Sequence, residues 1–428
     1  MSNFKDFGFL PADILLPKEG TDLCKFSVVA CDQYTSEPEY WESVDEFVGE
    51  APSALRMILP EVYLSEEELD TQVETINSKM AEYLKDGLFE EYKNSFIYVE
   101  RRQNNGAVRN GLIGMVDLEA YDFIPEKEAL IRATEGTVIE RIPPRVRIRR
   151  KAPLELPHIM LLIDDAEKTV IEPICEKKDE LVKLYDFKLM KYSGSIKGYL
   201  VPASEAEHIL PALEQIASET TQKERYGKFT GNPLVFAVGD GNHSLASAKK
   251  CWENIRENLS PEEAENHPAR YALVELVNVH DESLEFEAIH RVLFGCNPQK
   301  VLAAMKVAFP GMYEGRGEGH KIGYVTSEGE GVLTIPNPPF ALEIATLQGF
   351  LDDYMNAMGG KLDYIHGADV VRSLCVNDDE AIGFIVPSMG KSELFSGIVN
   401  DGVLPRKTFS MGEAQDKRFY LEARRLAR

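Results

Sequence analysis

Strand-like and helix-like segments alternate along the whole sequence, and this alternation limits the possible folds more than any other feature. The apolar runs HIMLLIDD, PLVFAVG and ARYALVELVNV have the composition of buried strands. Amphipathic patterns typical of helices occur at 65–95, about 204–222, 243–258, 298–308 and 340–358. This alternation predicts an α/β to α+β fold with mixed rather than purely parallel sheets.

Two local patterns add detail to this prediction. The helix at 65–95 is expected to begin with a capping box, in which Ser65 and Glu68 satisfy backbone N–H groups that have no partner within the helix. In RVRIR, residues 145–149, charged and apolar residues alternate as they do in a strand with one solvent-facing side. This stretch is therefore predicted to be an arginine-rich strand.

No repeat and no low-complexity linker divides the 428 residues, a length typical of about two to three domains. We expect three regions, with boundaries near residues 190 and 297. Residues 1–190 would form a mixed α/β region that contains the arginine-rich strand. Residues 191–297 would carry the turn DGNHS, and residues 298–428 would form a C-terminal α/β region.

Charge and composition disfavour several classes of function. The formal net charge of −24 argues against broad binding to nucleic acids or anionic membranes, because both depend on attraction to phosphates. The sequence contains no run of about 18 apolar residues and no secretory signal pattern. The six cysteines lack metal-binding spacing, which favours reduced thiols and a cytoplasmic protein. A homo-oligomer is compatible with the sequence, which leaves the oligomeric state open.

The turn DGNHS, residues 240–244, joins a buried strand to a helix and is strongly polar. Gly241 permits a backbone angle that other residues resist and leaves room for a ligand against the main chain. The N–H groups of residues 242–244, together with the helix dipole, make an anion cradle to which His243 and Ser244 can add side-chain donors. In the alternative interpretation Asp240 or Asn242 caps an ordinary helix. The residues alone leave these two interpretations equally weighted.

Several other catalytic motifs are disfavoured or absent. A nucleophilic triad of Asp240, His243 and Ser244 is disfavoured, because adjacent residues on a helix do not face each other. FIVPSMGKSELF, residues 384–395, is similar to a P-loop, but its first glycine is misplaced, so we expect a minor anion site at most. The expected metal is a magnesium ion held mainly by nucleotide phosphates and by a carboxylate such as Asp240 or Asp32.

Polar residues that follow predicted strands are candidates for binding a substrate. Asp32, Gln33 and Tyr34 come after the apolar strand FSVVA, at the end of a strand where α/β proteins place ligands. A turn before a capped helix is the alternative interpretation. In ATEGT, Glu135 and Thr137 share one face of an extended segment, and Glu135 is the preferred general base for a substrate hydroxyl. A surface glutamate paired with a neighbouring arginine is equally plausible.

Basic residues elsewhere are candidates for contacts with anionic groups. Arg145 and Arg147 would share one face of the arginine-rich strand, where guanidinium groups suit phosphate or carboxylate, unless this is a solvated face paired with acidic neighbours. Lys407 is a candidate for a further phosphate contact, with a surface lysine as the alternative. His290 and Arg291 are candidates for binding a substrate, although such a pair is more often structural.

These motifs are together similar to the signature blocks of a bacterial and archaeal family, the domain of unknown function 1015. DGNHS resembles the family's D-G-H-H-R helix start, with Asn242 in place of the first histidine and Ser244 in place of the arginine. Four further blocks resemble family signatures: VVACDQYTSEPEYW, IRATEGTVIERIPPR, DYIHGADVV and DGVLPRKTFSMGEAQDKRFYLEAR. The chain is thus identified as a member of this family over essentially its whole length.

Around DGNHS the family is in turn similar to the ParB/sulfiredoxin-like fold, which includes free-serine kinases that use a nucleotide. The resemblance implies a ParB/sulfiredoxin-like nucleotide-binding core within a larger, elaborated chain. It also implies that the helix start cradles nucleotide phosphates and that a nearby glutamate acts as the base. Because the motif arginine is absent, Arg145, Arg147 or Lys407 would have to supply the positive charge.

The function expected from these observations is a nucleotide-dependent phosphotransferase that acts on a small hydroxyl metabolite such as free serine or phosphoserine. ATP or ADP with magnesium would be the cofactors, and Glu135, His243 and Asp240 the catalytic residues. Phosphate would be bound by Gly241, Asn242, Ser244, Arg145, Arg147 and Lys407. The substrate would be bound by Asp32, Gln33, Tyr34, Thr137, His290 and Arg291. A non-catalytic regulatory protein that binds a nucleotide or phosphometabolite, or a phosphohydrolase, is the alternative.

Overall fold

The structure, a computed structural model, describes residues 3–65, 67–125 and 127–426, and these form two compact units. The first unit comprises the residues up to Leu284 together with the segment that begins at Glu413, and the second unit is Glu285–Gly412. The expected division differs from this one. The boundary near residue 190 falls between two strands that pair with each other, β10 (Val182–Lys188) and β11 (Ser195–Pro202).

The described residues of the first unit form an eleven-stranded sheet in the order β10-β11-β4-β5-β13-β9-β12-β7-β6, with β1 beside β5 and β2 beside β4. Parallel pairs (β12 with β7, β13 with β9 and β6 with β7) occur beside antiparallel pairs, so the predicted mixed α/β class is confirmed. The remaining strands are β1 Phe9–Leu10, β2 Ala12–Pro17, β4 Phe89–Arg102, β5 Val108–Asp117, β6 Tyr121–Asp122, β7 Ile131–Ala133, β9 Met160–Ile163, β12 Phe236–Asp240 and β13 Tyr271–Asn278.

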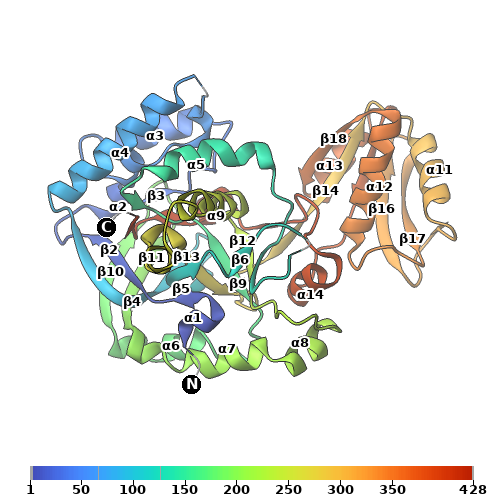
Figure 1. Cartoon of the computed structure of the whole chain (residues 1–428). Helices are drawn as coiled ribbons and strands as arrows, with labels where there is room; N and C mark the ends of the chain where they lie inside the picture. Colours follow the sequence, from blue (N-terminus) through green and yellow to red (C-terminus); the bar gives the residue numbers. More distant parts are fainter. Residues whose placement is uncertain (1–2, 66, 126, 427–428) are drawn as a thin grey trace. The chain divides into compact units, whose positions relative to one another are not determined.

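The large sheet is buried on both faces, and alternate residues of β4 show this directly. Phe96 and Tyr98 belong to one hydrophobic core, whereas Ile97 and Val99 belong to the other, as expected for a strand whose side chains alternate between faces. Helix α7 packs into the first core, and helices α3 and α4 pack into the second (Figure 1). The helices of this unit are α1 Phe4–Phe7, α2 Leu23–Phe26, α3 Pro38–Val48, α4 Leu69–Lys85, α5 Ile142–Arg150, α6 Glu172–Glu176, α7 Ile209–Ala217, α8 Glu219–Tyr226, α9 Asn242–Arg256 and α10 Pro261–Glu265.

The arginine-rich strand predicted at 145–149 is wrong, because this stretch lies inside helix α5. Pro143 and Pro144 occupy the first turn, where the fixed φ of proline favours a helix and its missing N–H costs nothing. Arg147, Arg149 and Arg150 fall in the last turn, where positive charge interacts favourably with the helix dipole. The alternation of charged and apolar residues therefore does not form the expected arginine-lined face.

The helix predicted at 65–95 is shorter than expected. Helix α4 begins at Leu69, and its cap residue is Glu68, whose side chain makes no capping bond, so the helix does not start with the predicted capping box of Ser65 and Glu68. Glu66 lies outside the described residues. The chain from Phe89 onward is already in β4, where it pairs with β2. Strand pairing thus overrides the local helical pattern at this end.

Residues 413–426, which we call the C-terminal strap, return to the first unit and bind to it through backbone pairing. Strand β21 (Phe419–Tyr420) pairs with β3 (Val28–Val29), and β22 (Arg424–Arg425) pairs with β8 (Leu154–Glu155). Between them, Ala423 forms a bridge with Leu15 of β2. The strap therefore contacts segments from distant parts of the sequence.

The described residues of the second unit form a seven-stranded antiparallel sheet in the order β15-β17-β16-β19-β14-β18, with β20 beside β14. Its strands are β14 Phe286–Phe294, β15 Tyr313–Glu314, β16 His320–Thr326, β17 Gly329–Ile335, β18 Lys361–His366, β19 Ala381–Ile385 and β20 Phe409–Met411. Its helices are α11 Pro298–Ala308, α12 Glu343–Met358, α13 Ala368–Cys375 and α14 Lys391–Asp401. Nowhere in the described part of the chain is a helix both long and apolar enough to cross a bilayer.

Candidate functional site

The turn DGNHS connects β12 to helix α9 as predicted, and Gly241 is the residue that makes this connection possible. Its φ of +79° lies in the left-handed region, and a Cβ atom on it would lie 3.1 Å from the Cα atom of Ile159. The N-terminal cap residue of α9 is Gly241, which has no side chain to make a capping bond, so neither Asp240 nor Asn242 is the cap. The first turn of this 15-residue helix thus presents backbone N–H groups that have no partner within the helix.

The extended segment 134–138 is attached to the first turn of α9 at two points. The Oδ1 atom of Asn242 accepts a hydrogen bond from the Thr134 N–H (3.1 Å), and its Nδ2 atom donates to the Thr134 Oγ1 atom (3.0 Å). The Nε2 atom of His243 accepts a hydrogen bond from the Val138 N–H (3.2 Å). Asn242 is therefore buried and faces the protein interior, whereas it was predicted to bind phosphate.

Glu135 and Thr137 lie between these two attachment points, and both are half-buried. The Thr137 hydroxyl oxygen is buried and has no hydrogen-bond partner among the described residues. A buried polar atom of this kind is uncommon and is often explained by a missing ligand or water. The two residues that were predicted to bind and activate a substrate are thus held beside the start of α9.

Lys417 of the strap supplies a positive charge at the same turn. Its Nζ atom lies 3.3 Å from the Oδ2 atom of Asp240, and the other carboxylate oxygen accepts a hydrogen bond from the Gly241 N–H (2.9 Å). Burial raises the pKa of the Asp240 carboxyl, but Lys417 and His158 lower it by more, so its pKa lies below the usual value. Asp240 is thus ionised and paired with a lysine that the sequence analysis did not select.

Ser244, on the first turn of α9, contacts His158, and through this histidine it is linked to Tyr420. Its Oγ atom lies 2.9 Å from the Nε2 atom of His158, and the Nδ1 atom of that ring lies 2.6 Å from the Tyr420 hydroxyl. His158 is buried, and its Nε2 atom is also 3.8 Å from the Oδ2 atom of Asp32. These contacts bring the predicted residues Asp32 and Ser244 to a common histidine.

The predicted residues 32–34 form a tightly held loop beside His158. The Gln33 side chain donates to Asp32 (3.0 Å), and the Gln33 carbonyl oxygen accepts from the Trp41 indole (3.3 Å). Tyr34 has a φ of +52°, in the left-handed region, and its ring stacks on Tyr40 with centroids 3.6 Å apart. Non-glycine residues in this region are strained and cluster at functional sites, so the loop is compatible with the role predicted for it.

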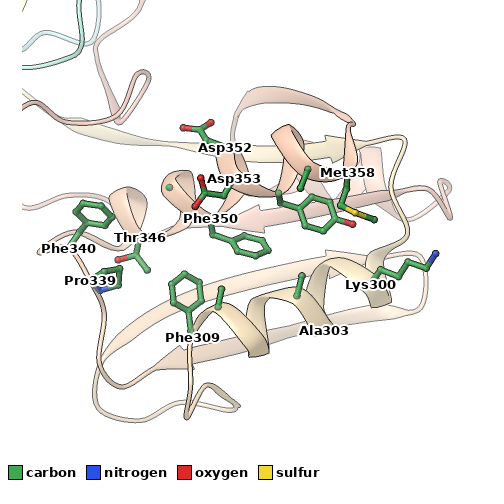
Figure 2. A pocket seen from close by; sticks show the side chains of 15 residues that line it. Lys300, Ala303, Phe309, Pro339, Phe340, Thr346, Phe350, Asp352, Asp353 and Met358 are labelled. Atoms are coloured by element: carbon green, nitrogen blue, oxygen red, sulfur yellow. The ribbon is translucent and has the colours of Figure 1, made fainter.

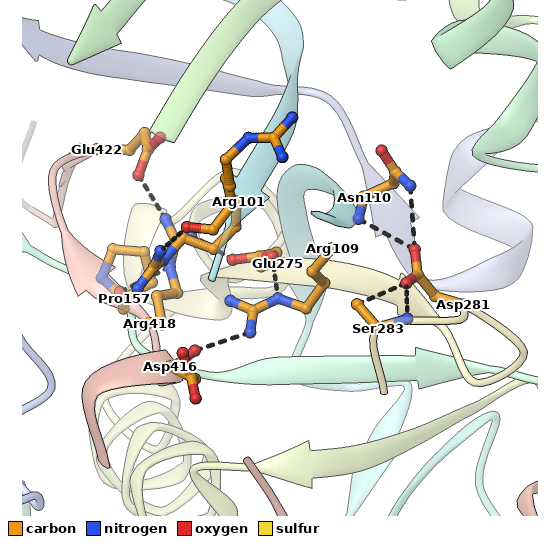
Figure 3. Close-up of polar contacts among 11 residues, drawn as sticks. Arg101, Arg109, Asn110, Pro157, Glu275, Asp281, Ser283, Asp416, Arg418 and Glu422 are labelled. Carbon is orange, nitrogen blue, oxygen red and sulfur yellow. Dashed lines mark hydrogen bonds and ion pairs between the residues drawn. The ribbon is translucent and has the colours of Figure 1, made fainter. Parts of the chain in front are cut away.

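A buried network of charged residues fixes the position of the strap, as Figure 3 shows. Arg418 binds Glu275 (2.6 Å) and Glu422, and its Nε atom donates to the carbonyl oxygen of Pro157 (3.1 Å). Arg109 binds the other side of Glu275 (3.3 Å) and donates to the Asp416 carbonyl oxygen (3.0 Å). Because this network holds the neighbours of Lys417 and of His158, it positions both of these side chains.

The arginines of α5 are separated rather than placed on a common face. Arg145 bonds to Glu61, whose backbone N–H donates to the Cys31 carbonyl oxygen (2.8 Å), so Arg145 lies next to the loop of Asp32. Arg147 instead pairs with Asp70 (2.7 Å) on α4 and is largely exposed. Side chains two positions apart on a helix point in different directions. One of the two predicted arginines therefore lies near the candidate site and the other does not.

Three of the predicted residues belong to the second unit. Lys407 is exposed there and has a φ of +58°. Arg291 is fully buried, where it donates to Gln348 (3.1 Å) and to the carbonyl oxygens of Arg406 (3.0 Å) and Ile289. Burial also lowers the pKa of His290, whose Nδ1 atom accepts the Val386 N–H (3.3 Å). The contacts of Arg291 and His290 are those of side chains that stabilise the second unit.

A pocket of about 880 Å³ lies between α11 and α12 in the second unit. Figure 2 shows the rings of Phe309 and Phe350 facing this space, with Lys300 and Asp353 at its edges. The lining is mainly apolar and contains none of the predicted site residues. Since such a lining suits neither a phosphate nor a small polar metabolite, the candidate site is the one at the start of α9.

The predicted magnesium ligand does not form a metal site with its neighbours. Asp240 is already bonded to Lys417 and to the Gly241 N–H. The described residues contain no group of three or more His, Cys, Asp or Glu side chains that could hold a metal ion. The predicted magnesium ion would be held mainly by nucleotide phosphates, so a ligand role for Asp240 or Asp32 stays a prediction.

The fold and the site define a mixed α/β protein whose candidate site is an uncapped helix start with a lysine beside it. The model of the family described as "Protein of unknown function (DUF1015)" matches residues 13–354, and the chain belongs to this family. The family resemblance predicted from the sequence is thereby confirmed. Among curated proteins, none matches the sequence.

Several solved structures are similar at low levels of identity. A free serine kinase in complex with AMP is 10% identical, with a TM-score of 0.38 over 73% of this chain and 91% of that one. A conserved hypothetical protein from Pyrococcus furiosus is 11% identical, with a TM-score of 0.36 over 73% and 94% of the two chains. SbnI with a C-terminal truncation, from Staphylococcus aureus, is 10% identical, with a TM-score of 0.37 over 70% and 82%.

Three residues of the candidate site were not predicted from the sequence, namely His158, Lys417 and Tyr420. Lys417 and Tyr420 lie in the block DGVLPRKTFSMGEAQDKRFYLEAR, and His158 begins the run HIMLLIDD. Both stretches were recognised as features of the chain, but nothing in their spacing indicates that they meet. The pairing of the strap with β3 and β8 and the buried network around Arg418 bring them to α9.

Proposed function

We propose that the protein is a nucleotide-dependent phosphotransferase that transfers a phosphoryl group to the hydroxyl of a small polar metabolite such as free serine. The observation that carries this proposal is the uncapped N-terminus of α9 with Lys417 beside it. Backbone N–H groups that have no partner within the helix, the helix dipole and an ammonium group together favour an anion at this position. The phosphates of ATP or ADP are the anions that we assign to it.

The roles of the other residues follow from their positions. Glu135 is held beside the helix start through Thr134 and Val138, where its carboxylate accepts the proton of the substrate hydroxyl. The buried Thr137 hydroxyl supplies a hydrogen-bonding group for the substrate. Asp240 holds Lys417 in place, and the reaction is promoted by positioning and electrostatic stabilisation of the phosphoryl group.

The resemblance of DGNHS to the helix start of nucleotide-dependent serine kinases also supports this proposal. The arginine of the family motif is replaced by Ser244, and Lys417 provides a cation at the same turn from a different part of the chain. A lysine binds phosphate as a compact point charge and does not need the planar geometry of a guanidinium. The substitution is therefore compatible with phosphate binding.

The experiment that tests the proposal is an assay of the full chain with ATP or ADP, magnesium and a panel of hydroxyl amino acids. Phosphorus NMR should show a new phosphomonoester that depends on the amino acid. Replacing the base in Glu135→Gln should lower kcat by about 10²- to 10⁴-fold. Glu140→Gln is the matched control, because Glu140 is exposed on the same connection and should leave kcat unchanged.

The other outcomes separate the alternative functions. Nucleotide binding without turnover on any acceptor would overturn the phosphotransferase and favour a regulatory binding protein. Release of inorganic phosphate without a phosphorylated acceptor would instead favour a phosphohydrolase. If neither ATP nor ADP binds, the assignment of phosphates to α9 is wrong.

A further inference from the structure

We propose that Ser244 is a nucleophile that carries the phosphoryl group as a covalent intermediate, with His158 as its base. The inference deepens the function proposed above and rests on it, since it specifies how a nucleoside di- or triphosphate would donate its terminal group. A direct transfer needs only one base, at the acceptor hydroxyl. The structure offers a further nucleophile with its own base, Ser244 and His158, and a direct transfer leaves both of them unused.

The geometry of Ser244 is that of an activated nucleophile. Its Oγ atom lies 2.9 Å from the Nε2 atom of His158, which is within reach for transfer of a proton. The serine is on the first turn of α9, beside the N–H groups and the lysine that would hold the phosphates. A base with hydrogen-bond contact to the nucleophile and a third group that orients the base is the usual arrangement in covalent catalysis.

Tyr420 is the group that orients the histidine. Its hydroxyl oxygen lies 2.6 Å from the Nδ1 atom of His158 and accepts a hydrogen bond from the Cys31 N–H (3.2 Å). The Cys31 thiol also contacts this hydroxyl, and it stays protonated because burial and the nearby Asp32 raise its pKa to about 12. The phenol proton can point to the sulfur, so that Tyr420 accepts the Nδ1–H of His158. In this tautomer the Nε2 lone pair faces Ser244.

The surroundings of His158 stabilise the positive charge that it acquires. The Oδ2 atom of Asp32 lies 3.8 Å from its Nε2 atom, and Asp240 interacts with it electrostatically. The ring is buried, so these carboxylates act with little screening by water. A serine hydroxyl is a weak nucleophile at its usual pKa, and an adjacent base with an oriented ring compensates for this.

The reaction would proceed in two balanced steps. In the first, Ser244 Oγ attacks the terminal phosphorus of the nucleotide, and the Ser244 proton moves to His158. The Oγ–P bond forms, the bridging P–O bond breaks, and the shortened nucleotide leaves. In the second step Glu135 takes the proton of the acceptor hydroxyl, whose oxygen attacks the phosphorus. Ser244 leaves and recovers its proton from His158, and Glu135 releases the proton of the acceptor to solvent.

The test uses the full chain and a nucleotide radiolabelled in its terminal phosphoryl group, with no acceptor present. We expect acid-stable label on the protein, which fragmentation mass spectrometry places on Ser244. Ser244→Ala should carry no label, and His158→Gln should be labelled about 10²- to 10⁴-fold more slowly. Ser247→Ala is the matched control, because Ser247 lies one turn further along α9, bonds to the His243 carbonyl oxygen (2.6 Å) and should be labelled normally.

A second measurement on the unaltered protein does not depend on whether the variants fold. Each in-line displacement inverts the configuration at phosphorus, so two successive steps give net retention with a chirally labelled nucleotide. Retention would support the intermediate. Net inversion, or transfer by Ser244→Ala at the normal rate, would overturn it while leaving the proposed phosphotransferase intact. Failure of the unaltered protein to bind nucleotide or transfer phosphate would overturn both.

Discussion

The Nε atom of Arg418 donates a hydrogen bond to the carbonyl oxygen of Pro157 across 3.1 Å, and this contact joins the neighbours of two site residues. Lys417 precedes Arg418, and His158 follows Pro157. The same guanidinium binds Glu275 and Glu422 in the buried interior. One arginine thus helps to set the distance of the strap from the segment that carries the histidine, so the geometry of the site depends on this buried network.

Replacing Arg418 should destabilise the first unit strongly. Arg418→Met leaves the Glu275 and Glu422 carboxylates buried without this partner, which typically costs about 3–5 kcal/mol of unfolding free energy. Both tryptophans of the chain, Trp41 and Trp252, are in the first unit, so urea unfolding followed by tryptophan fluorescence reports on it alone.

Arg372→Met is the control for this substitution. Arg372 is an exposed residue of the second unit that pairs with Glu330 (2.8 Å), and exposed pairs of this kind contribute little to stability. Its replacement should leave the tryptophan transition in place. A loss below about 1 kcal/mol in Arg418→Met would show that the network does not hold the strap.

The stability contributed by Glu275 should depend on pH. Burial raises the pKa of this carboxyl, but Arg109 and Arg418 lower it by more, so its folded-state pKa lies below the usual value. Its contribution is therefore fully present above the unfolded-state pKa of about 4.3 and is lost as the pH falls through the folded-state pKa. The difference in unfolding free energy between the unaltered protein and Glu275→Gln should shrink over that range. A difference that stays constant or grows on acidification would refute this account.

Asn242 should be needed to hold the segment of Glu135 in place. Asn242→Ala removes the acceptor of the buried Thr134 N–H, a loss of about 1–3 kcal/mol that thermal or urea unfolding would detect. Asn242→Asp keeps an oxygen for that N–H but loses the donor to Thr134 Oγ1, so its stability should be intermediate. Phosphotransferase activity should fall in the same order. Equal stability of the two variants would argue that the Thr134 N–H bond is unimportant.

Gly241 should tolerate no side chain. An alanine in the left-handed region costs about 1–2 kcal/mol, and at this position its Cβ would also press on Ile159 at 3.1 Å. Gly106→Ala is the control, because Gly106 has a φ of +89° but no atom within 4 Å of the added carbon. Differential scanning calorimetry should therefore show a larger fall in Tm for Gly241→Ala than for Gly106→Ala. Similar values for the two would mean that the contact with Ile159 relaxes without cost.

The fold class and the strand–turn–helix junction were predictable because they depend on local pattern. Helix α9 begins at Asn242, one residue from the predicted start, and its residues Leu245, Ala248 and Trp252 are buried as their spacing indicates. The stretch 145–149 was predicted wrongly because its alternation of charged and apolar residues is also found in strands. The preceding prolines and the packing of α5 on α9 favour a helix instead.

The site itself could be predicted only in part. Asp240 and Ser244 were selected because they flank one turn, and Glu135 because it shares one face of an extended segment with Thr137, and these are local features. His158 and Lys417 reach the same turn through pairing between strands that lie far apart in the sequence. No residue spacing encodes such long-range contacts, so the cation that compensates for the missing motif arginine was sought at Arg145, Arg147 and Lys407 instead.

The central claim is that the start of α9 binds nucleotide phosphates with the help of Lys417. Calorimetric titration of ADP or ATP into the full chain tests it most directly, with Lys417→Met compared against Lys250→Met, an exposed lysine on the surface of the same helix. The account predicts that Lys417→Met weakens binding at least 10-fold, about 1.4 kcal/mol, while Lys250→Met binds as the unaltered protein does. Equal affinities for Lys417→Met and the unaltered protein, or no nucleotide binding at all, would contradict it.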